Sequence, residues 1–256
     1  MYPHYLFKSG FCASVLVILG FYPLFCSAQT MTFNGSGTSW NVAGHWTPAN
    51  VPDTAGESAY VPDTLVNPFL NLNMSPAIDW LTLDNSSATF YLNNYTLTIY
   101  QSQGFTNSGS THANNVTATI NGIVTNTVSG QINIWGGKRL YLKGPMITNN
   151  GVITVNSDVG AGNTYLIFTD DILFNGSGDL VLSDTIYNFV QGQVNTHRLT
   201  NAAGHTIRGS HHLGNNSMAL TNQGLIQADQ SLPLIIDPTD NQTVFNSGIM
   251  QANGGT

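Results

Sequence analysis

Two neighbouring carboxylates, Asp170 and Asp171 in the stretch FTDDILF, are the residues of this chain best suited to acid–base catalysis. A pair of carboxylates can divide the roles of acid and base in the cleavage of a glycosidic bond. A basic residue, Arg208, and a histidine, His211, follow further along the chain. If the chain is an enzyme, we expect these four side chains to converge in one groove. If it is not, we expect them on several faces, with the two aspartates in a solvated loop.

Three histidines, His205, His211 and His212, lie within the stretch HTIRGSHH and supply the imidazole groups that transition metals prefer. Adjacent residues on a strand point to opposite faces, so His211 and His212 are not expected to share a ligand. No cysteine and no close carboxylate completes a coordination sphere in this stretch. We therefore expect exposed loop histidines here, and neither a metal nor a cofactor.

The elements that would position these residues follow from a repeat. The stretch TNQGLIQAD, residues 221–229, returns 24 residues later as FNSGIMQAN, residues 245–253. The same unit recurs upstream at intervals of 20 to 27 residues, around Gly130, Gly151, Gly178, Gly204, Gly224 and Gly248. Irregular intervals of this size indicate a solenoid in which the strands are fixed and the loops vary.

Apolar and polar residues alternate after each glycine. Two positions on stand Ile132, Ile153, Leu180, Ile226 and Met250. This period of two is typical of a strand with one buried face, and strands of about five residues are stable only when stacked. The copy at Gly204 places Ile207 three positions on, so we expect its register to shift by one.

The stacked strands predict an all-β fold, a right-handed parallel β-helix of about ten coils that begins near residue 30. A β-sandwich is the alternative, because short strands at regular spacing also suggest it. In the β-helix, Ile153, Leu180, Ile226 and Met250 must form one column.

The Asn that precedes most of these glycines has two possible roles. It can be a generic turn former, since Asn tolerates left-handed backbone. Alternatively, stacked Asn side chains can form a ladder of amide hydrogen bonds. The sequence leaves both roles open.

The first 28 residues read as a secretory signal. Lys8 precedes an apolar run, and small residues ending at Ala28 predict cleavage before Gln29. Both cysteines of the chain, Cys12 and Cys26, lie inside this segment.

The remainder of the chain, after residue 28, has five Lys and Arg against 13 Asp and Glu, a formal charge of −8. This balance disfavours nucleic acid, which requires clustered cations, and anionic membrane surfaces.

The stretch GTSWNVAGHWTPANVPDTAGESAYVP, residues 37–62, resembles the start of large bacterial secreted β-helix proteins. Their pattern of two Trp, a Pro, Gly-Asp-x-Ala and an aliphatic residue matches Trp40, Trp46, Pro52, Gly56, Ala59 and Val61. Glu57 stands where that pattern has Asp, which leaves the local hydrogen bond open. Residues 81–100 and the stretches LTNAAGHTIRGSHHLG and LTNQGLIQAD resemble later coils of the same group. The group includes autotransporter passengers and filamentous-haemagglutinin-like adhesins.

The resemblance implies a non-enzymatic segment of a larger bacterial exoprotein, adhesin-like or a structural stalk. The implied location is extracellular or at the cell surface, associated with the outer membrane. The alternative is a polysaccharide-degrading β-helix enzyme, a glycoside hydrolase or lyase, that acts through Asp170 and Asp171. Expected partners are a host-surface or polysaccharide ligand, or neighbouring surface proteins, but no nucleic acid and no membrane span in the mature segment.

Three segments follow from these features. They are a signal peptide (1–28), an N-terminal cap with the Trp motif (29–62) and the β-helix coils (63–256). Trp40 and Trp46 are expected to cover the open end of the first coil, as a solenoid requires; a sugar-stacking platform is the alternative. The last copy stops at MQANGGT, whereas its partner copy continues, so we expect the chain to be the N-terminal fragment of a longer protein.

Overall fold

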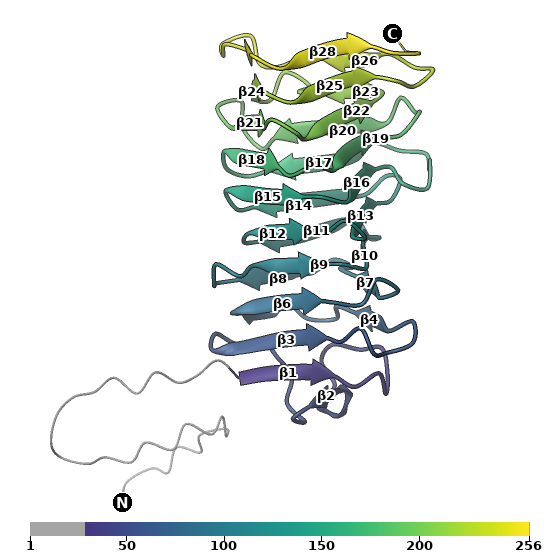
Figure 1. Cartoon of the computed structure of the whole chain (residues 1–256), viewed down its shortest axis with the longest axis vertical. Coiled ribbons are helices and arrows are strands. Elements are labelled where there is room, and N and C mark those ends of the chain that lie inside the picture. The colour runs from purple at the N-terminus through teal and green to yellow at the C-terminus, as the bar shows by residue number, and fades with distance from the viewer. Residues whose placement is uncertain (1–28, 256) are drawn as a thin grey trace, which may run out of the picture.

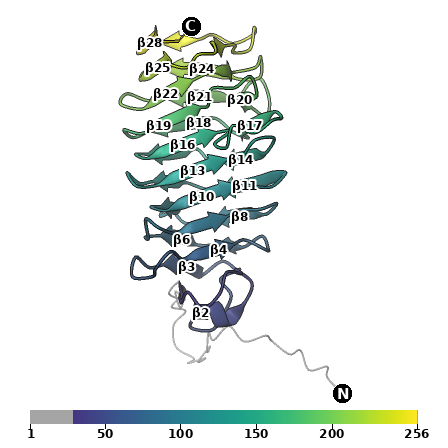
Figure 2. The same ribbon diagram turned by 90° about the vertical axis from the view of Figure 1, so that its right-hand side faces the viewer.

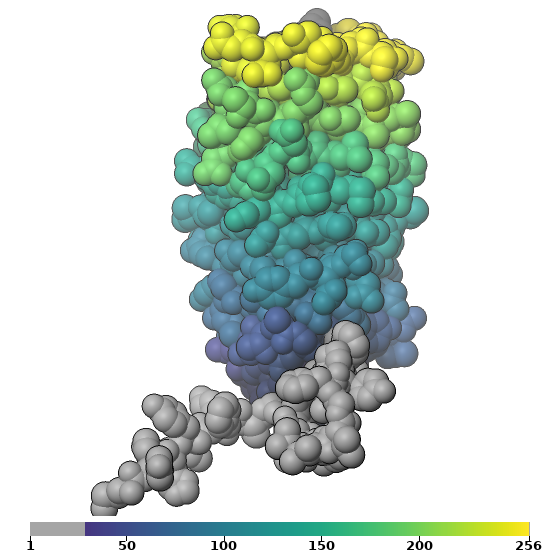
Figure 3. Space-filling view, turned by 90° about the vertical axis from the view of Figure 1, so that its left-hand side faces the viewer, coloured from purple at the N-terminus to yellow at the C-terminus, as the bar shows by residue number. Residues whose placement is uncertain are grey.

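The computed structural model describes residues 29–255, and the proposed signal peptide lies outside them. The described residues wind into an elongated stack of strands (Figures 1 and 2). The sequence colours run in order from one end of the stack to the other (Figure 3), because each turn of the chain lies on the turn before it.

The strands form three long sheets, here named sheets A, B and C. Sheet A contains β1 (Gln29–Phe33), β2 (Trp46–Thr47), β3 (Glu57–Val61), β6 (Trp80–Leu83), β9 (Phe105–Asn107), β12 (Val124–Asn126), β15 (Met146–Asn149), β18 (Ile172–Asn175), β21 (Arg198–Asn201), β24 (Ala219–Asn222) and β27 (Phe245–Asn246). Sheet B contains β4 (Phe69–Asn71), β7 (Thr89–Tyr91), β10 (Ser110–Ala113), β13 (Gln131–Ile134), β16 (Val152–Val155), β19 (Asp179–Leu182), β22 (Thr206–Gly209), β25 (Leu225–Ala228) and β28 (Ile249–Ala252). Sheet C contains β5 (Ala77–Ile78), β8 (Thr96–Ile99), β11 (Thr117–Asn121), β14 (Arg139–Lys143), β17 (Thr164–Phe168), β20 (Asn188–Gly192), β23 (His211–Leu213) and β26 (Leu234–Ile236).

Each turn of the chain contributes one strand to sheet A, then one to B, then one to C. This order repeats eight times from β3 to β26, and β27 and β28 add a partial turn. All neighbouring strands pair in parallel except β1 and β2, which are antiparallel. The only helical element in residues 29–255 is the short 3-10 helix η1 (Ala43–His45).

The interior is built from columns of aliphatic residues that are in register from turn to turn. In sheet B one column runs through Ile132, Ile153, Leu180, Ile207, Ile226 and Met250. All but Met250 are almost completely buried. The predicted parallel β-helix is therefore confirmed, and the β-sandwich alternative is wrong because the strands stack in parallel rather than as two opposed antiparallel sheets.

Two tryptophans close the N-terminal end of the interior. Trp40 and Trp46 are 0% and 1% exposed, and their ring centroids are 4.9 Å apart. The indole N–H of Trp46 donates to the carbonyl of Trp40 at 2.8 Å, and that of Trp40 donates to the carbonyl of Pro52 at 2.8 Å. With its faces buried, the pair is the expected cover of the first turn and cannot serve as a sugar platform.

Glu57, which stands where the Trp motif has Asp, accepts hydrogen bonds with both of its carboxylate oxygens. One carboxylate oxygen, Oε2, accepts from the backbone N–H groups of Asp53 and Thr54 at 3.0 and 3.1 Å. The other, Oε1, accepts from Asn50 Nδ2 at 2.7 Å. The longer side chain thus ties down the loop that leads into β3. Burial and the nearby Glu57 charge raise the pKa of Asp53.

The repeated glycines stack at the corner where sheet A turns into sheet B. A Cβ atom on Gly151 would overlap the carbonyl oxygen of Gly130 in the turn before, and one on Gly248 would overlap that of Gly224. The backbones of successive turns therefore approach each other at this corner more closely than any side chain permits. The glycine spacing recognised in the sequence marks these contacts.

Replacement of Gly151 by Ala tests this close approach. We expect Gly151→Ala to lower the free energy of unfolding by about 1–3 kcal/mol, as overpacking does, because the new methyl group meets backbone rather than a flexible side chain. Gly44→Ala is the matched control, since a Cβ there has nothing within 4 Å. Equal urea midpoints for the two variants would show that the corner has room to spare.

Candidate functional site

A row of buried Asn side chains runs along the corner between sheets A and B. In the first half of the stack, Asn107 Nδ2 donates to Asn126 Oδ1, and Asn126 Nδ2 donates to Asn149 Oδ1, both at 2.8 Å. The same Nδ2 groups also donate to backbone carbonyls of the next strand in sheet B, such as that of Val152 for Asn126. All three side chains are 0% exposed. The Asn ladder is therefore present, and these residues are more than turn formers.

A second row of the same kind occupies the last turns. Asn201 Nδ2 donates to Asn222 Oδ1, and Asn222 Nδ2 donates to Asn246 Oδ1, again at 2.8 Å. Between the two rows lies β18, where Phe174 rather than an Asn is in register with Asn201. The phenyl ring is buried and offers no hydrogen bond, so the polar row is interrupted at this turn.

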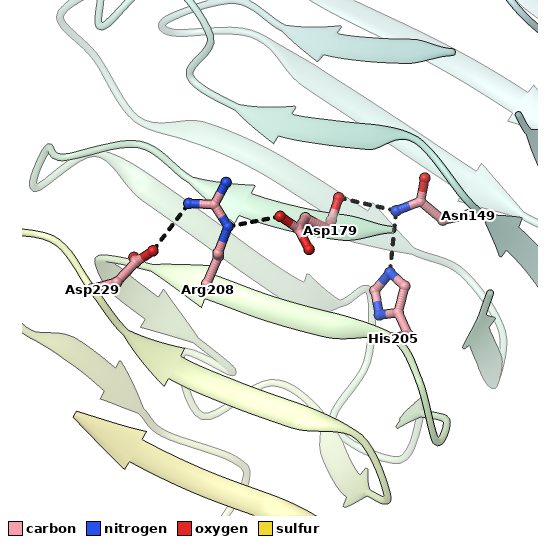
Figure 4. A network of polar contacts seen from close by, with 5 residues as sticks. All are labelled: Asn149, Asp179, His205, Arg208 and Asp229. Atoms are coloured by element: carbon pink, nitrogen blue, oxygen red, sulfur yellow. Dashed lines mark hydrogen bonds and ion pairs between the residues drawn. The ribbon is translucent and has the colours of Figure 1, made fainter. Parts of the chain in front are cut away.

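His205 bridges the interruption (Figure 4). Its Nδ1 lies 2.7 Å from Asn201 Oδ1, and its Nε2 lies 3.2 Å from Asn149 Nδ2. Because the first partner accepts and the second donates, these contacts fit the neutral imidazole with its proton on Nδ1. The side chain is 0% exposed, and burial lowers the pKa of His205 to about 4, partly opposed by the charge of Asp179.

In other turns, a Cβ added to the corner glycine would meet the carbonyl oxygen of the glycine in the turn before, as for Gly151 and Gly130. At Gly224 it would meet the carbonyl oxygen of His205, so His205 and not Gly204 occupies the corner position in its turn. The extra residue explains the predicted one-residue shift of Ile207, which is nevertheless in register with Leu180. The expectation that His205 is an exposed loop residue is wrong, because its ring fills the gap left by the missing Asn.

Arg208, one of the four catalytic candidates, lies on the outward side of sheet B. Its Nε is 2.8 Å from Asp179 Oδ2, and one terminal nitrogen is 3.0 Å from Asp229 Oδ2 (Figure 4). The three residues belong to three successive turns, so the guanidinium ties these turns together through two ion pairs.

The other three candidates lie elsewhere. Asp170 and Asp171 are exposed in the turn between β17 of sheet C and β18 of sheet A, and Asp171 accepts a backbone hydrogen bond from Arg198 at 2.8 Å. His211 opens β23 in sheet C, with Nδ1 3.0 Å from the carbonyl oxygen of Asn188. Within residues 29–255, no hydrogen bond or ion pair links any of the four candidates to another. Their catalytic role stays a prediction.

His211 and His212 lie side by side, which differs from the expectation that they point to opposite faces. Their ring centroids are 4.4 Å apart, and both rings contact Phe189. The cause is the backbone of His211, whose φ of 73° is left-handed and breaks the alternation of the strand. In the part of the chain that the structure describes, no group of three or more His, Cys, Asp or Glu side chains is placed to hold a metal ion.

An outward column of rings follows sheet C, and sequence reasoning missed it. Arg139, Tyr165, Phe189 and His212 are in register in successive strands. The guanidinium carbon of Arg139 lies 5.1 Å from the Tyr165 ring centre, and the Tyr165–Phe189 and Phe189–His212 centroids are 4.9 and 5.3 Å apart. We call these four residues the sheet C column. No spacing signal reveals it, because turns of unequal length separate its members.

The chain was also compared with known proteins: no protein-family model, curated protein or solved structure matches it. In the described residues, no helix has the length and apolarity needed to cross a membrane.

The pKa of His205 predicts acid sensitivity of the fold. Since the folded state holds the imidazole neutral, its contribution to stability is complete above the unfolded pKa of about 6.5 and is lost as the pH falls towards 4. We expect a loss of about 3 kcal/mol between pH 7 and pH 4 from this group. His205→Gln keeps a donor and an acceptor but cannot titrate, so its unfolding free energy should change less over this range. An identical pH dependence in the two proteins would contradict the role given to His205.

Proposed function

We propose that this chain is a non-enzymatic, extracellular or cell-surface β-helix segment that serves as a structural stalk or an adhesive surface of a larger protein. The observation that carries the proposal is the separate placement of the four catalytic candidates. Arg208 is held in ion pairs with Asp179 and Asp229, and Asp171 receives a hydrogen bond from the Arg198 backbone. These contacts fasten neighbouring turns to one another, which is a structural use of charged groups.

The outward faces of the sheets also support an adhesive role. In sheet A, a column of hydroxyl groups is in register over four turns, at Thr82, Thr106, Thr125 and Thr148. Parallel strands place such groups about 4.8 Å apart. A partner with its own repeat can contact several of them at once, and such multivalent contacts add affinity without any single strong site.

The proposed location rests on the leader-like residues 1–28 and on the absence of cysteine after Cys26 in the sequence. A chain that leaves the cell without disulfides depends on its core and its hydrogen bonds for stability. The continuous aliphatic columns and the Asn ladder supply both.

A binding and turnover assay on the full chain tests the proposal. We expect retention on an immobilised polysaccharide or on cell surfaces, with no release of reducing ends or unsaturated products. The double variant Asp170→Asn, Asp171→Asn should be retained equally well, because neither carboxylate has a part in binding. Product release by the wild type that disappears in this variant would overturn the proposal in favour of a glycoside hydrolase or lyase.

A further inference from the structure

We propose that the outward face of sheet C binds a linear, anionic polysaccharide, with the sheet C column and Lys143 as its contact residues. This inference rests on the adhesive form of the proposed function and names the ligand class. The ligand is defined by carboxylate or sulfate groups repeated along an extended chain.

The first observation is the distribution of charge. Residues 29–255 carry an excess of eight acidic residues, yet none of the eight strands of sheet C contains an Asp or a Glu. Three of the five Lys and Arg in these residues, Lys138, Arg139 and Lys143, lie on β14 or immediately before it. Sheet C therefore presents positive charge on a molecule that is otherwise acidic.

The second observation is that these cations are uncommitted. Arg139 and Lys143 are exposed, and neither forms an ion pair within the described residues. They stand four residues apart on one strand with Tyr141 between them, so all three face outward. By contrast, the guanidinium of Arg208 on sheet B is neutralised by ion pairs with Asp179 and Asp229. Arg198 of sheet A has no ion pair in the described residues either, but its guanidinium donates to Thr221 Oγ1 at 3.1 Å and to the carbonyl of Leu220 at 3.3 Å. The side chains of Arg139 and Lys143 have neither kind of partner among these residues.

The third observation concerns the rings of the column. The interplanar angles are 22° for Tyr165 and Phe189 and 8° for Phe189 and His212, so each ring covers the face of the next. Arg139 covers the remaining face of Tyr165. A neutral sugar stacks on a free ring face, and these faces are already covered. The ring edges stay accessible to a ligand, and because aromatic edges carry partial positive charge they favour an anionic group.

The column also offers directed donors. Tyr165 Oη accepts a hydrogen bond from Asn163 at 3.2 Å, so its own hydrogen is available to an outside acceptor. Among residues 29–255, the acidic group paired with the column lies at its far end, where Asp237 Oδ2 is 3.9 Å from His212 Nδ1. The donors therefore concentrate towards Arg139 and Tyr165, and an anionic group would be held at that end first.

The shape of the face favours an extended polysaccharide over nucleic acid. The members of the column are in register over four turns, with neighbours at the strand spacing of about 4.8 Å. Duplex DNA carries about one negative charge per 1.7 Å and needs a correspondingly dense set of cations. Two or three cations among ring edges suit a chain with sparser charges and apolar sugar carbons between them.

Binding of the full chain to four immobilised probes tests the proposal: polygalacturonate, heparin, neutral dextran and duplex DNA. The first two probes separate carboxylate from sulfate groups. We expect binding to at least one of them, weakening as NaCl is added, and little binding to dextran or DNA. Arg139→Gln and Lys143→Gln should each weaken binding about three- to fivefold, the range of one exposed charge pair.

Arg198→Gln is the matched control. Arg198 lies over the Phe245 ring at 5.3 Å, much as Arg139 lies over Tyr165, but it belongs to sheet A. It should change the affinity less than about twofold. Equal losses of affinity in Arg139→Gln and Arg198→Gln would mean that binding depends only on the net charge of the chain, which would overturn the proposal. Binding of DNA as tight as that of the polysaccharides would overturn it too.

Two further results separate this inference from the proposed function. Retention on cells or dextran that is unaffected by Arg139→Gln and Lys143→Gln would overturn the sheet C site and leave an adhesive role intact. Degradation of polygalacturonate that depends on Asp170 and Asp171, together with binding that does not depend on Arg139 or Lys143, would overturn both.

Discussion

The buried row of Asn amides at the corner between sheets A and B is the constraint on which the rest of the structure depends. A buried amide without a partner costs about 1–3 kcal/mol, so each Asn must find the Asn of the next turn and a carbonyl of the next strand in sheet B. Asn126 does both, with Asn149 Oδ1 and Val152 O as acceptors. These demands can be met only if successive turns are superimposed. The row therefore fixes the register of all three sheets, and the glycines beside it permit the close backbone approach it needs.

The interrupted turn at β18 shows how strict this constraint is. At this turn the ring of Phe174 stands where an Asn amide would be. His205 from the following turn restores the polar row, and its ring centroid lies 5.5 Å from that of Phe174. A titratable group is thus used as a neutral hydrogen-bond bridge, at the cost of a lowered pKa. Because the corner fixes the turns, the outward positions are free to differ between faces. Sheet A carries a column of threonines, sheet B the ion pairs of Arg208 and a Tyr91–His112 ring stack, and sheet C cations beside a longer ring stack.

The sequence predicted the features that repeat locally and missed those that do not. The alternation after each glycine was sufficient for the β-helix and for the column through Ile153 and Leu180. Asn126 stands four positions before Gly130, whereas Asn149 and Asn222 stand two positions before their glycines, so the local pattern does not mark it. It is nevertheless a full member of the ladder. The role of His205 depends on a contact with Asn149, 56 residues earlier, which no local pattern contains. Its only sequence signal was the displaced Ile207. The conformation of His211 and the sheet C column likewise arise from turns and from register between distant strands.

The most direct test of this account is the stability of Asn126→Leu, which keeps the size of the side chain but removes its amide. Asn149 Oδ1 and the Val152 carbonyl would lose a donor, so we expect a loss of at least about 2 kcal/mol in urea unfolding. Asn133→Leu, at an outward and half-buried position of sheet B, removes a hydrogen bond to Ser110 Oγ at 3.0 Å, and water can replace that partner. It should therefore change stability by less than about 1 kcal/mol. If the two variants were equally stable, the amide row would be a consequence of the stacked turns and not the interaction that fixes them.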